Sequence, residues 1–317
     1  MLIEMRQNKL INKNQAGIAL IMVLLVVALV SIIATGITAK QNLSTRRTQN
    51  LLYSEQGYMY LLGAEDWAKN ILGQDFKDNK TDSFNDNWAT NLPPIPVEGG
   101  TIQGKIEDLQ GRFNINSLLK AANPDQVSIK VFRNLLILND IDNKLSDAVV
   151  DWLDADLDST VPDGAEDGDY LNNATPSRAA NRLMVSASEL IIVKGFDNEK
   201  YSKLSPYIVA LPEATTININ TASAMQVSML SNQVSLSEAE DIIKNRDKSG
   251  FKSVDEFMSL DSVKGKNISK DLVSVSSQYY LLKARSVIGN LKSELYSIMH
   301  RDNQGKIKVL LRSQRRI

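Results

Sequence analysis

The sequence contains no cysteine, a single histidine and nearly equal numbers of charges of each sign. Its 317 residues include 36 Lys and Arg against 37 Asp and Glu. Without cysteine, neither a disulfide scaffold nor a thiolate metal site can form. His300 is the only imidazole and no P-loop motif occurs, so the sequence indicates neither a Ser-His-Asp triad nor an ATPase site. The balanced charge provides no overall field that would attract nucleic acid.

Charge is also absent from one long apolar segment, Ile18 to Ala39. This segment is long enough to cross a bilayer as an α-helix, which needs ~20 apolar residues. Its polar residues are Ser31, Thr35 and Thr38, whereas a buried helix of a soluble protein normally shows a full polar stripe. The pattern predicts one transmembrane helix, which continues over residues 40–72 as an amphipathic stalk.

The residues before this segment differ from an ordinary secretory signal. A secretory signal carries its small-residue cleavage site after the apolar run, but here Ala16-Gly17 precedes it. The basic leader, Gly17 and the immediate apolar helix resemble a type IV prepilin leader. That resemblance implies cleavage after Gly17 by a prepilin peptidase and methylation of the new terminus, Ile18. Most such proteins carry glutamate at the fifth mature position, where this chain has Met22. In that family the glutamate neutralises the terminal amine of the subunit above it, inside the apolar core of the filament. Because an unpaired buried charge is costly, a subunit that lacks this glutamate suits the tip of a filament, where no subunit lies above it.

Beyond the stalk, which Gly73 is predicted to end, the chain alternates between polar loops and patterned segments. Residues 74–99 read as a loop and residues 101–109 as a strand. Two stretches, Phe113-Asn-Ile-Asn-Ser117 and Ile217-Asn-Ile-Asn-Thr221, each lead into short helices, which indicates a duplicated helical domain. The tail predicts an antiparallel meander over 274–287, 291–299 and 306–311, with a hairpin turn at 302–305 and Arg312, Arg315 and Arg316 in an exposed end.

A run of carboxylates follows the first pair of predicted helices. Between Asp151 and Arg178 no lysine or arginine occurs, so these carboxylates repel one another unless a cation intervenes. Oxygen ligands on a loop that contains Gly164 and Gly168 suit Ca²⁺ better than Mg²⁺. The loop is not an EF-hand, since Ser159 replaces the required glycine. The alternative is a solvated acidic loop without a metal.

The order of these features resembles the K-type minor pseudopilin of type II secretion (general secretion pathway protein K). The resemblance rests on Gly17 with a non-glutamate fifth residue, the loop DWLDADLDSTVPDGAEDGDYL, the stretch SASELIIVKGF and the stretch LPEATTININTASA. It implies an α+β, pilin-like fold, with a long N-terminal transmembrane helix, a small antiparallel sheet and an inserted all-α pair of SAM/helix-hairpin-helix-like domains. It also implies calcium, with these candidate ligands: Asp154, Asp156, Asp158, Glu166, Asp167 and Asp169.

The same resemblance implies a place at the pseudopilus tip. The chain would be anchored once in the bacterial inner membrane with its bulk in the periplasm, and would initiate or cap filament assembly for the export of folded proteins. Its partners would be the I-type and J-type minor pseudopilins, prepilin peptidase and other secretion components. The predicted organisation is a prepilin leader (1–17), a transmembrane helix (18–39), a helical stalk (40–72), a pilin loop and strand (73–112), an inserted helical domain with the acidic loop (113–211), a second SAM-like repeat (212–272) and C-terminal strands (273–317).

Three other functions have weaker support in the sequence. A minor pilin of a type IV pilus would share residues 1–40. A helix-hairpin-helix DNA-uptake protein would share the second repeat, but the hairpin at 230–235 has no glycine and its surroundings are not basic, so no nucleic-acid partner is expected. Catalysis is not expected either, because a lone histidine such as His300 is more often a surface or packing residue.

Overall fold

The structure is a computed structural model that describes residues 4–91, 93–172, 176–246 and 250–315. Its first element is a single long helix, α1 (Glu4–Asp78). No proline occurs before Pro93, so nothing in the sequence forces the helix to break. The hydroxyls of Ser31, Thr35 and Thr38 each donate to the carbonyl four residues earlier, at 2.8 to 2.9 Å. The polar side chains of the apolar segment are therefore satisfied within the helix, as a membrane span requires.

The prediction that Gly73 ends the stalk is wrong, since the helix continues for five residues to Asp78. Tertiary contacts hold this last turn and outweigh the low helix propensity of glycine. Asp75 lies against Arg301. The Phe76 ring lies beneath the Arg301 guanidinium, with 5.3 Å between Arg301 Cζ and the centroid of the ring. Such contacts join segments far apart in the sequence, so the local pattern could not reveal them.

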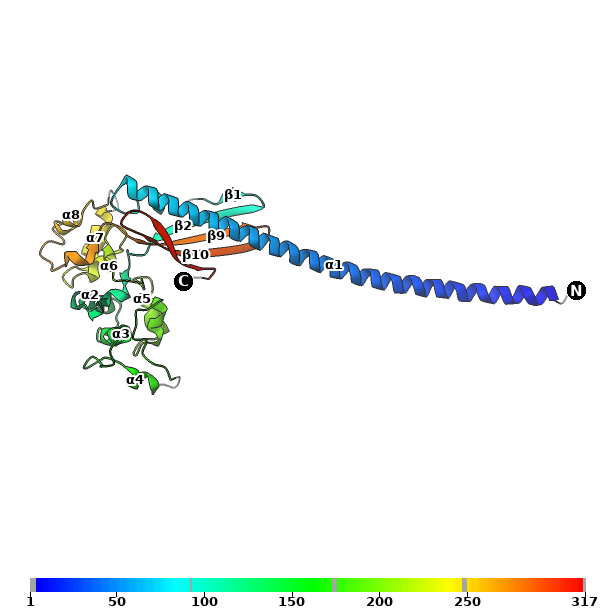
Figure 1. Ribbon diagram of the computed structural model, residues 1–317, viewed down its shortest axis with the longest axis horizontal. Coiled ribbons are helices and arrows are strands. Elements are labelled where there is room, and N and C mark those ends of the chain that lie inside the picture. Colours follow the sequence, from blue (N-terminus) through cyan, green and yellow to red (C-terminus); the bar gives the residue numbers. More distant parts are fainter. Residues whose placement is uncertain (1–3, 92, 173–175, 247–249, 316–317) are drawn as a thin grey trace.

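A five-stranded antiparallel sheet packs against the distal half of α1 (Figure 1). The order is β1 (Ile95–Val97), β2 (Gly100–Asp108), β9 (Tyr279–Ile288), β10 (Leu291–Arg301) and β11 (Ile307–Ser313). Alternate residues of β9 and β10, among them Leu282 and Met299, pack onto Leu61 and Leu72 of the helix. The β10–β11 hairpin turns at residues 302–305 as predicted, with Gly305 N donating to the Asp302 carbonyl at 2.9 Å. The sequence placed the start of the meander at 274, but the strand begins at Tyr279.

Arg312 is exposed, as the sequence predicted, but its charge is paired. Its guanidinium donates two hydrogen bonds of 2.8 Å to Glu65, a carboxylate of α1 that is 1% exposed. Burial alone would raise the pKa of Glu65, but hydrogen bonds from Arg312, Ser297 and Lys69 outweigh it and lower that pKa to about 2. This contact ties the last strand to the helix.

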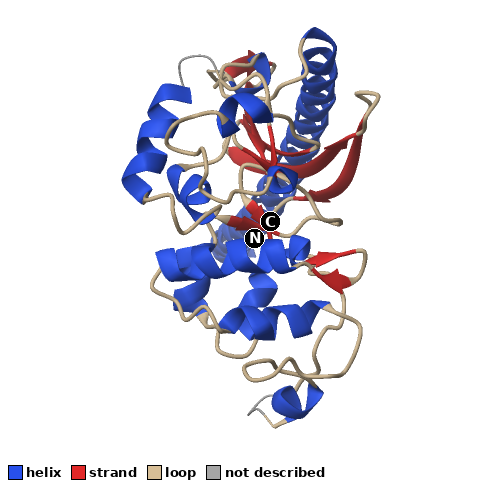
Figure 2. Cartoon of the chain, turned by 90° about the vertical axis from the view of Figure 1, so that its left-hand side faces the viewer, coloured by secondary structure: helices blue, strands red, loops and turns tan. Residues whose placement is uncertain are grey.

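Residues 109–278 form an insert between two neighbouring strands of the sheet. Strands β2 and β9 are hydrogen-bonded along their length, from Gly100 opposite Ile288 to Asp108 opposite Tyr280. The chain therefore leaves the sheet at the end of β2 and returns at the start of β9. Figure 1 shows that the helical insert lies at the end of the sheet, far from the N-terminus. Figure 2 views the molecule from that end, with the helices of the insert beside and below the strands of the sheet.

The insert consists of two consecutive parts of similar plan, each opened and closed by a short parallel strand pair. The first part contains β3 (Phe113–Asn114), α2 (Gln126–Leu138), α3 (Leu145–Leu153), α4 (Asp167–Leu171), α5 (Asn198–Leu204) and β6 (Ile208–Val209), with 3₁₀ turns at Ile115–Leu118 and Ala187–Ile192 and the two-residue strands β4 (Leu119–Lys120) and β5 (Asn123–Pro124). The second contains β7 (Ile217–Asn218), α6 (Ala224–Met229), α7 (Leu236–Arg246), α8 (Val254–Met258) and β8 (Val273–Ser274). Further 3₁₀ turns lie at Asn87–Ala89 and Lys270–Leu272.

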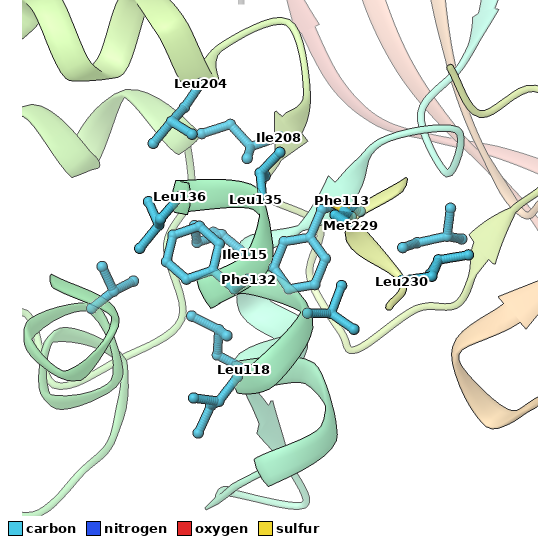
Figure 3. Packing of buried hydrophobic residues seen from close by; sticks show 14 of the residues in the cluster. Phe113, Ile115, Leu118, Phe132, Leu135, Leu136, Leu204, Ile208, Met229 and Leu230 are labelled. Atoms are coloured by element: carbon cyan, nitrogen blue, oxygen red, sulfur yellow. The ribbon is translucent and has the colours of Figure 1, made fainter. Parts of the chain in front are cut away.

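The two parts also use the same hydrogen bonds. In the first part, the Asn116 side chain accepts from the backbone N–H of Met184 and donates to its carbonyl, both at 2.9 Å. In the second, the Asn220 side chain does the same with Phe251, at 2.7 and 2.9 Å. Each asparagine thus fixes the segment that leads into a later helical element of its part, Ala187–Ile192 in the first and α8 in the second. Phe113 and Phe132 stack at 5.6 Å in the shared apolar core (Figure 3).

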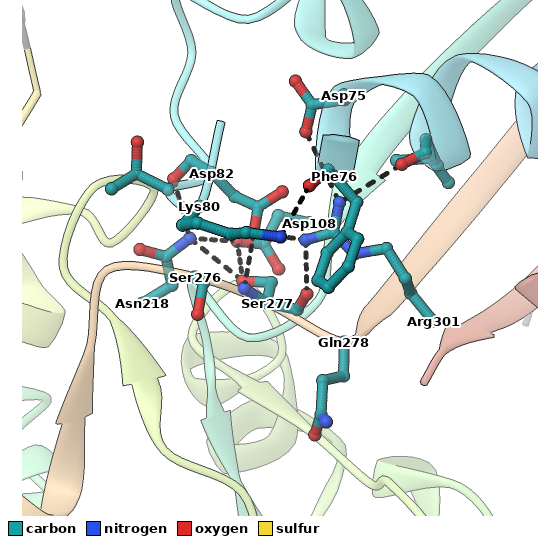
Figure 4. Close-up of polar contacts among 12 residues, drawn as sticks. Asp75, Phe76, Lys80, Asp82, Asp108, Asn218, Ser276, Ser277, Gln278 and Arg301 are labelled. Atoms are coloured by element: carbon teal, nitrogen blue, oxygen red, sulfur yellow. Dashed lines mark hydrogen bonds and ion pairs between the residues drawn. The ribbon is translucent and has the colours of Figure 1, made fainter. Parts of the chain in front are cut away.

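A buried polar cluster joins the insert to the helix and sheet (Figure 4). Arg301, at the end of β10 and 3% exposed, donates to Asp82 at 2.5 Å and to the Ser277 carbonyl at 2.8 Å, and lies 3.4 Å from Asp75. Burial, followed by the charges of Asp86 and Asp82, raises the pKa of Asp75 to about 7. One guanidinium therefore contacts carboxylates of both the end of α1 and the loop after it.

Asp108, the last residue of β2, extends this cluster into the second part of the insert. One of its carboxylate oxygens accepts from Asn218 at 2.9 Å, from Thr221 at 2.5 Å and from Ser277 at 2.6 Å. Burial raises the pKa of Asp108, although these hydrogen bonds favour the charged form. The position of the insert on the sheet is thus set by hydrogen bonds between buried groups, which require specific geometry.

Candidate functional site

The candidate site is the acidic loop between α3 and α4, at the extremity of the insert (Figure 1). Asp151, in the last turn of α3, is completely buried and organises the loop. Its carboxylate accepts from Thr160 N at 3.0 Å, from the Thr160 hydroxyl at 2.5 Å and from Ala165 N at 2.7 Å. The loop is therefore folded back onto the helix from which it emerges.

Gly164 makes this closure possible. A Cβ at this position would lie 2.1 Å from Asp151 Oδ2 and 2.6 Å from Thr160 N and O. No such contact occurs at Gly168, where an added Cβ would have nothing within 4 Å. The two glycines of the loop thus differ: the first is required by close packing and the second is not.

The closed loop brings three carboxylates together. Asp154, Asp156 and Glu166 each offer an oxygen, and these oxygens lie within 4.8 Å of one another. Asp154 and Glu166 are buried, whereas Asp156 is exposed. Asp154 Oδ1 and both Glu166 oxygens have no hydrogen-bond donor in the part of the chain that the structure describes. Buried carboxylate oxygens are normally satisfied, so this group can accept a cation.

The electrostatics of the two buried carboxylates point the same way. Burial, then the charges of Asp156 and Asp151, raises the pKa of Asp154 to about 6. Burial, then Asp151 and the other nearby carboxylates, raises the pKa of Glu166 to about 7. The negative charges are therefore poorly compensated by the protein itself. Hard oxygen donors in this arrangement fit a divalent cation such as Ca²⁺.

The other candidate ligands are engaged elsewhere. Asp169 pairs with Lys194 at 2.7 Å, and the ammonium lowers the pKa of that carboxyl. Asp167 accepts from Ala179 N at 3.0 Å and lies 3.7 Å from Arg178. Asp158 is exposed, and its backbone N–H donates to Asp156. The geometry therefore separates a central group of three from three peripheral carboxylates.

Sequence reasoning did not identify the residues that support this group from a distance. Lys194 Nζ also donates to the Gly164 carbonyl at 3.3 Å, and its backbone N–H donates to the Tyr170 hydroxyl. Asn181 donates to the Asp156 carbonyl at 2.9 Å. Trp152 packs edge-on against Tyr170 at 5.2 Å, which anchors the loop to the core. For Lys194 and Asn181 no local signal exists, because both act across long stretches of chain.

The residues predicted at the membrane end lie along α1. Gly17, Ile18 and Met22 are exposed, as is every residue from 17 to 50. A Cβ at Gly17 would meet nothing within 4 Å. Among the described residues, α1 is the one helix long and apolar enough to cross a membrane.

A long apolar helix, an antiparallel sheet on its distal half and a large insert define a membrane-anchored subunit of the pilin class. Family models described as "Type II secretion system (T2SS), protein K" match residues 111–213 and 217–276. The type II secretion system protein K of Pseudomonas aeruginosa is 34% identical and that of Aeromonas hydrophila 31%, over 95% of this chain and 93% and 97% of the relatives. The chain belongs to the type II secretion system protein K family and is a minor pseudopilin of that system.

A solved structure agrees with this assignment. The fold is similar to a chain in the crystal structure of the GspK-GspI-GspJ complex from the type 2 secretion system of enterotoxigenic Escherichia coli. The TM-score is 0.74 at 25% identity, and the match covers 86% of this chain and 100% of the other. Family and structure together do not favour a type IV pilus subunit or a DNA-uptake protein, and the family is a structural component of a secretion apparatus.

Proposed function

We propose that this pseudopilin occupies the tip of the pseudopilus, where it initiates and caps assembly together with I-type and J-type minor pseudopilins. The observation that carries the proposal is the position of the insert, at the end of the molecule opposite the apolar N-terminal helix (Figure 1). A further subunit stacked above it would meet this insert. Met22 supports the same placement, since no carboxylate stands ready for the amine of a subunit above.

The apolar helix would anchor the precursor once in the inner membrane, with sheet and insert in the periplasm. A prepilin peptidase would cut after Gly17 and methylate Ile18. Other secretion components would then supply the work of assembly, so the chain acts as a structural subunit and not as an enzyme.

The partner proposal is tested by co-purification of the full chain. When it is expressed with the I-type and J-type pseudopilins of the same secretion system and extracted in detergent, we expect all three to elute together from a tag on this chain. The GspK-GspI-GspJ complex that contains the related chain supports this expectation. Elution of this chain alone, with both partners present in the extract, would count against it.

We also propose that the acidic loop holds Ca²⁺ in a structural role, through Asp154, Asp156 and Glu166. Bound Ca²⁺ would supply the positive charge that these carboxylates lack. The orphaned oxygens of the two buried carboxylates support the proposal most directly. Asp151 and Gly164 would hold the loop closed around the group. Lys194 would fix the Gly164 carbonyl and the Asp169 side chain beside it.

Calcium removal should therefore lower the melting temperature of the chain by several degrees. A ligand present at 100 times its dissociation constant stabilises by ~2.7 kcal/mol, and EGTA would remove that stabilisation. Gly164→Ala should abolish the calcium effect because its Cβ overlaps Asp151 Oδ2. The matched variant Gly168→Ala should retain the effect, since its Cβ has open space. Calorimetric scans with calcium and with EGTA measure both variants and the parent.

The charges can be tested separately from the loop shape. The double variant Asp154→Asn, Glu166→Gln removes the repulsion together with the ligand charges. In EGTA it should melt above the parent, and added calcium should leave it unchanged. Equal melting of the parent with and without EGTA would refute the calcium site.

Finally, we infer that the two parts of the insert are SAM- or helix-hairpin-helix-like modules produced by duplication. The equivalent roles of Asn116 and Asn220, and the closing parallel strand pairs of both parts, support this inference.

A further inference from the structure

The outer edge of β2 lacks a neighbouring strand over much of its length. β1 pairs with β2 only from Gly100 to Ile102, whereas β9 pairs with it from Gly100 to Asp108. Along the described part of the chain, no strand lies on the outer side of residues 103–108, and no backbone hydrogen bond joins residues 104–107 to any segment except β9. A free edge of this kind can pair with another extended chain through its N–H and C=O groups.

Gly104, near the middle of this edge, is not required by the packing of the chain itself. A Cβ added there would meet only Leu282 Cδ1, at 3.7 Å, which is an ordinary contact. Its φ is not positive either, so the backbone would accept other residues. Glycine weakens the interior of a strand, and it often marks a place where a second backbone approaches closely. The edge is thus free of a side chain where a partner would lie.

A hollow of about 370 Å³ lies beside this edge and is lined by Lys105, Lys283 and Arg285, among others. It opens on the face of the sheet turned away from α1, because Leu282 packs on the helix and successive side chains of a strand point to opposite faces. A second hollow, of about 510 Å³, shares Lys105 with the first and extends to Arg112.

Positive charge exceeds negative charge around these hollows. Lys105 and Lys283 stand directly opposite each other on neighbouring strands, which is unfavourable for like charges. Both approach Glu107, at 3.5 and 2.7 Å, and Arg112 lies 3.4 Å from the same carboxylate. One carboxylate thus serves three cations, which leaves two positive charges of this group uncompensated.

Arg285 adds a further cation to the first hollow. Its Nε atom is buried and has no acceptor in the part of the chain that the structure describes. Glu294 stands opposite Arg285 in β10, but its carboxylate accepts from the Tyr296 hydroxyl, at 3.0 Å. A guanidinium forms strong, often bidentate hydrogen bonds with carboxylates, so Arg285 suits an acidic ligand.

We propose that the outer edge of β2 binds an extended, acidic segment of a partner protein, which pairs with residues 103–107 through its main chain and turns its carboxylates toward Lys105 and Arg285. Addition of a strand to a free sheet edge is a recurrent mode of peptide recognition, in which main-chain hydrogen bonds provide affinity and alternate side chains provide specificity. Opposite charges on neighbouring strands also stabilise a sheet. No function proposed above uses this edge.

Lipid phosphates are the poorer match for these cations because the bilayer lies too far away. Ser286, next to Arg285, packs beside Gly57 of α1, where an added Cβ would lie 2.9 Å from the hydroxyl. The apolar segment ends at Ala39. At 1.5 Å per residue, roughly 27 Å of helix separate that end from Gly57. Headgroups at the surface of the membrane therefore do not reach this part of the sheet.

The test uses the full chain in detergent and labelled peptides, with binding followed by fluorescence polarisation. A peptide of alternating glutamate and valine carries all its carboxylates on one face when extended. It should bind, and it should bind less tightly as salt rises. The matched glutamine–valine peptide should bind about tenfold more weakly. A glutamate–valine peptide methylated on the edge-facing backbone nitrogens should not bind, since it cannot donate to β2. Equal binding of the methylated peptide, or no binding of the unmethylated one, would overturn the proposal.

Variants of the chain identify the site. Lys105→Gln with Arg285→Gln should weaken binding of the glutamate–valine peptide about tenfold. Lys120→Gln with Lys264→Gln, both exposed and on the insert, removes the same charge and should leave binding unchanged. Both double variants should melt with the parent, because Lys283 still pairs with Glu107. Unchanged affinity of the folded Lys105→Gln, Arg285→Gln chain would overturn the proposal. Displacement of the peptide by inorganic phosphate, at an ionic strength at which sodium chloride does not displace it, would overturn it as well.

Discussion

A chain that carries Gly17→Val is expected to keep its leader and to be absent from assembled pseudopili. The structure explains why this should be an effect on processing alone. Gly17 lies on an exposed helix where an added Cβ has nothing within 4 Å, so valine disturbs no contact of the chain itself. The side chain would instead obstruct the peptidase, which must reach the bond between Gly17 and Ile18. Mass spectrometry of the N-terminal peptide should show the unprocessed and unmethylated form.

Gly36→Val provides a matched control in the same helix. Gly36 is also exposed and also has open space for a Cβ, but it lies within the apolar segment. This variant should be cut and methylated like the parent. Normal processing of the Gly17→Val chain would show that the leader is not a prepilin leader, whatever the behaviour of the control.

Loss of Arg301 is expected to be the most destabilising single change in the globular part. Arg301→Met retains an apolar stem but leaves Asp82, 1% exposed, without its cation. Removing one partner of a buried ion pair typically costs 3–5 kcal/mol. Urea unfolding of the detergent-solubilised chain, followed by tryptophan fluorescence, measures the loss. Trp88 is a suitable reporter because its ring packs edge-on against Tyr280 of the same region, at 5.5 Å.

Two further variants separate charge from packing. Lys308→Met, on the exposed edge strand β11, should change the unfolding free energy by less than about 0.5 kcal/mol. Asp82→Asn added to Arg301→Met should recover part of the lost stability, since it removes the uncompensated charge. A loss below about 1 kcal/mol for Arg301→Met alone would show that the cluster does not fix the insert.

Local sequence signals predicted those parts of the structure that depend on nearby residues. The two Asn-x-Asn segments, the short helices that follow them and the β10–β11 turn were all recognisable because their periodicity or capping residues lie within a few positions. The end of α1 was misplaced because Arg301, from the last hairpin, stabilises its final turn. Propensity at Gly73 could not report that contact.

In the acidic loop, too, the sequence revealed what depends on nearby residues and not what depends on the fold. Its composition indicated a cation, but it did not indicate which carboxylates would meet. That selection depends on Asp151, which closes the loop through Thr160 and Ala165, and on Lys194, which draws Asp169 away from the central group. Both effects require the folded chain, since one depends on loop closure and the other joins α4 to the turn that follows Ala187–Ile192.

If this pseudopilin caps the filament, its position in assembled pseudopili will show it. The chain has no cysteine, so Lys264→Cys on the exposed surface of the second repeat introduces a single thiol. Sheared pseudopili would be labelled with maleimide-gold and viewed by electron microscopy, with the cysteine-free parent as background control. Tip placement predicts gold at one end of a filament and none along its shaft. Gold distributed along the shaft would contradict the account.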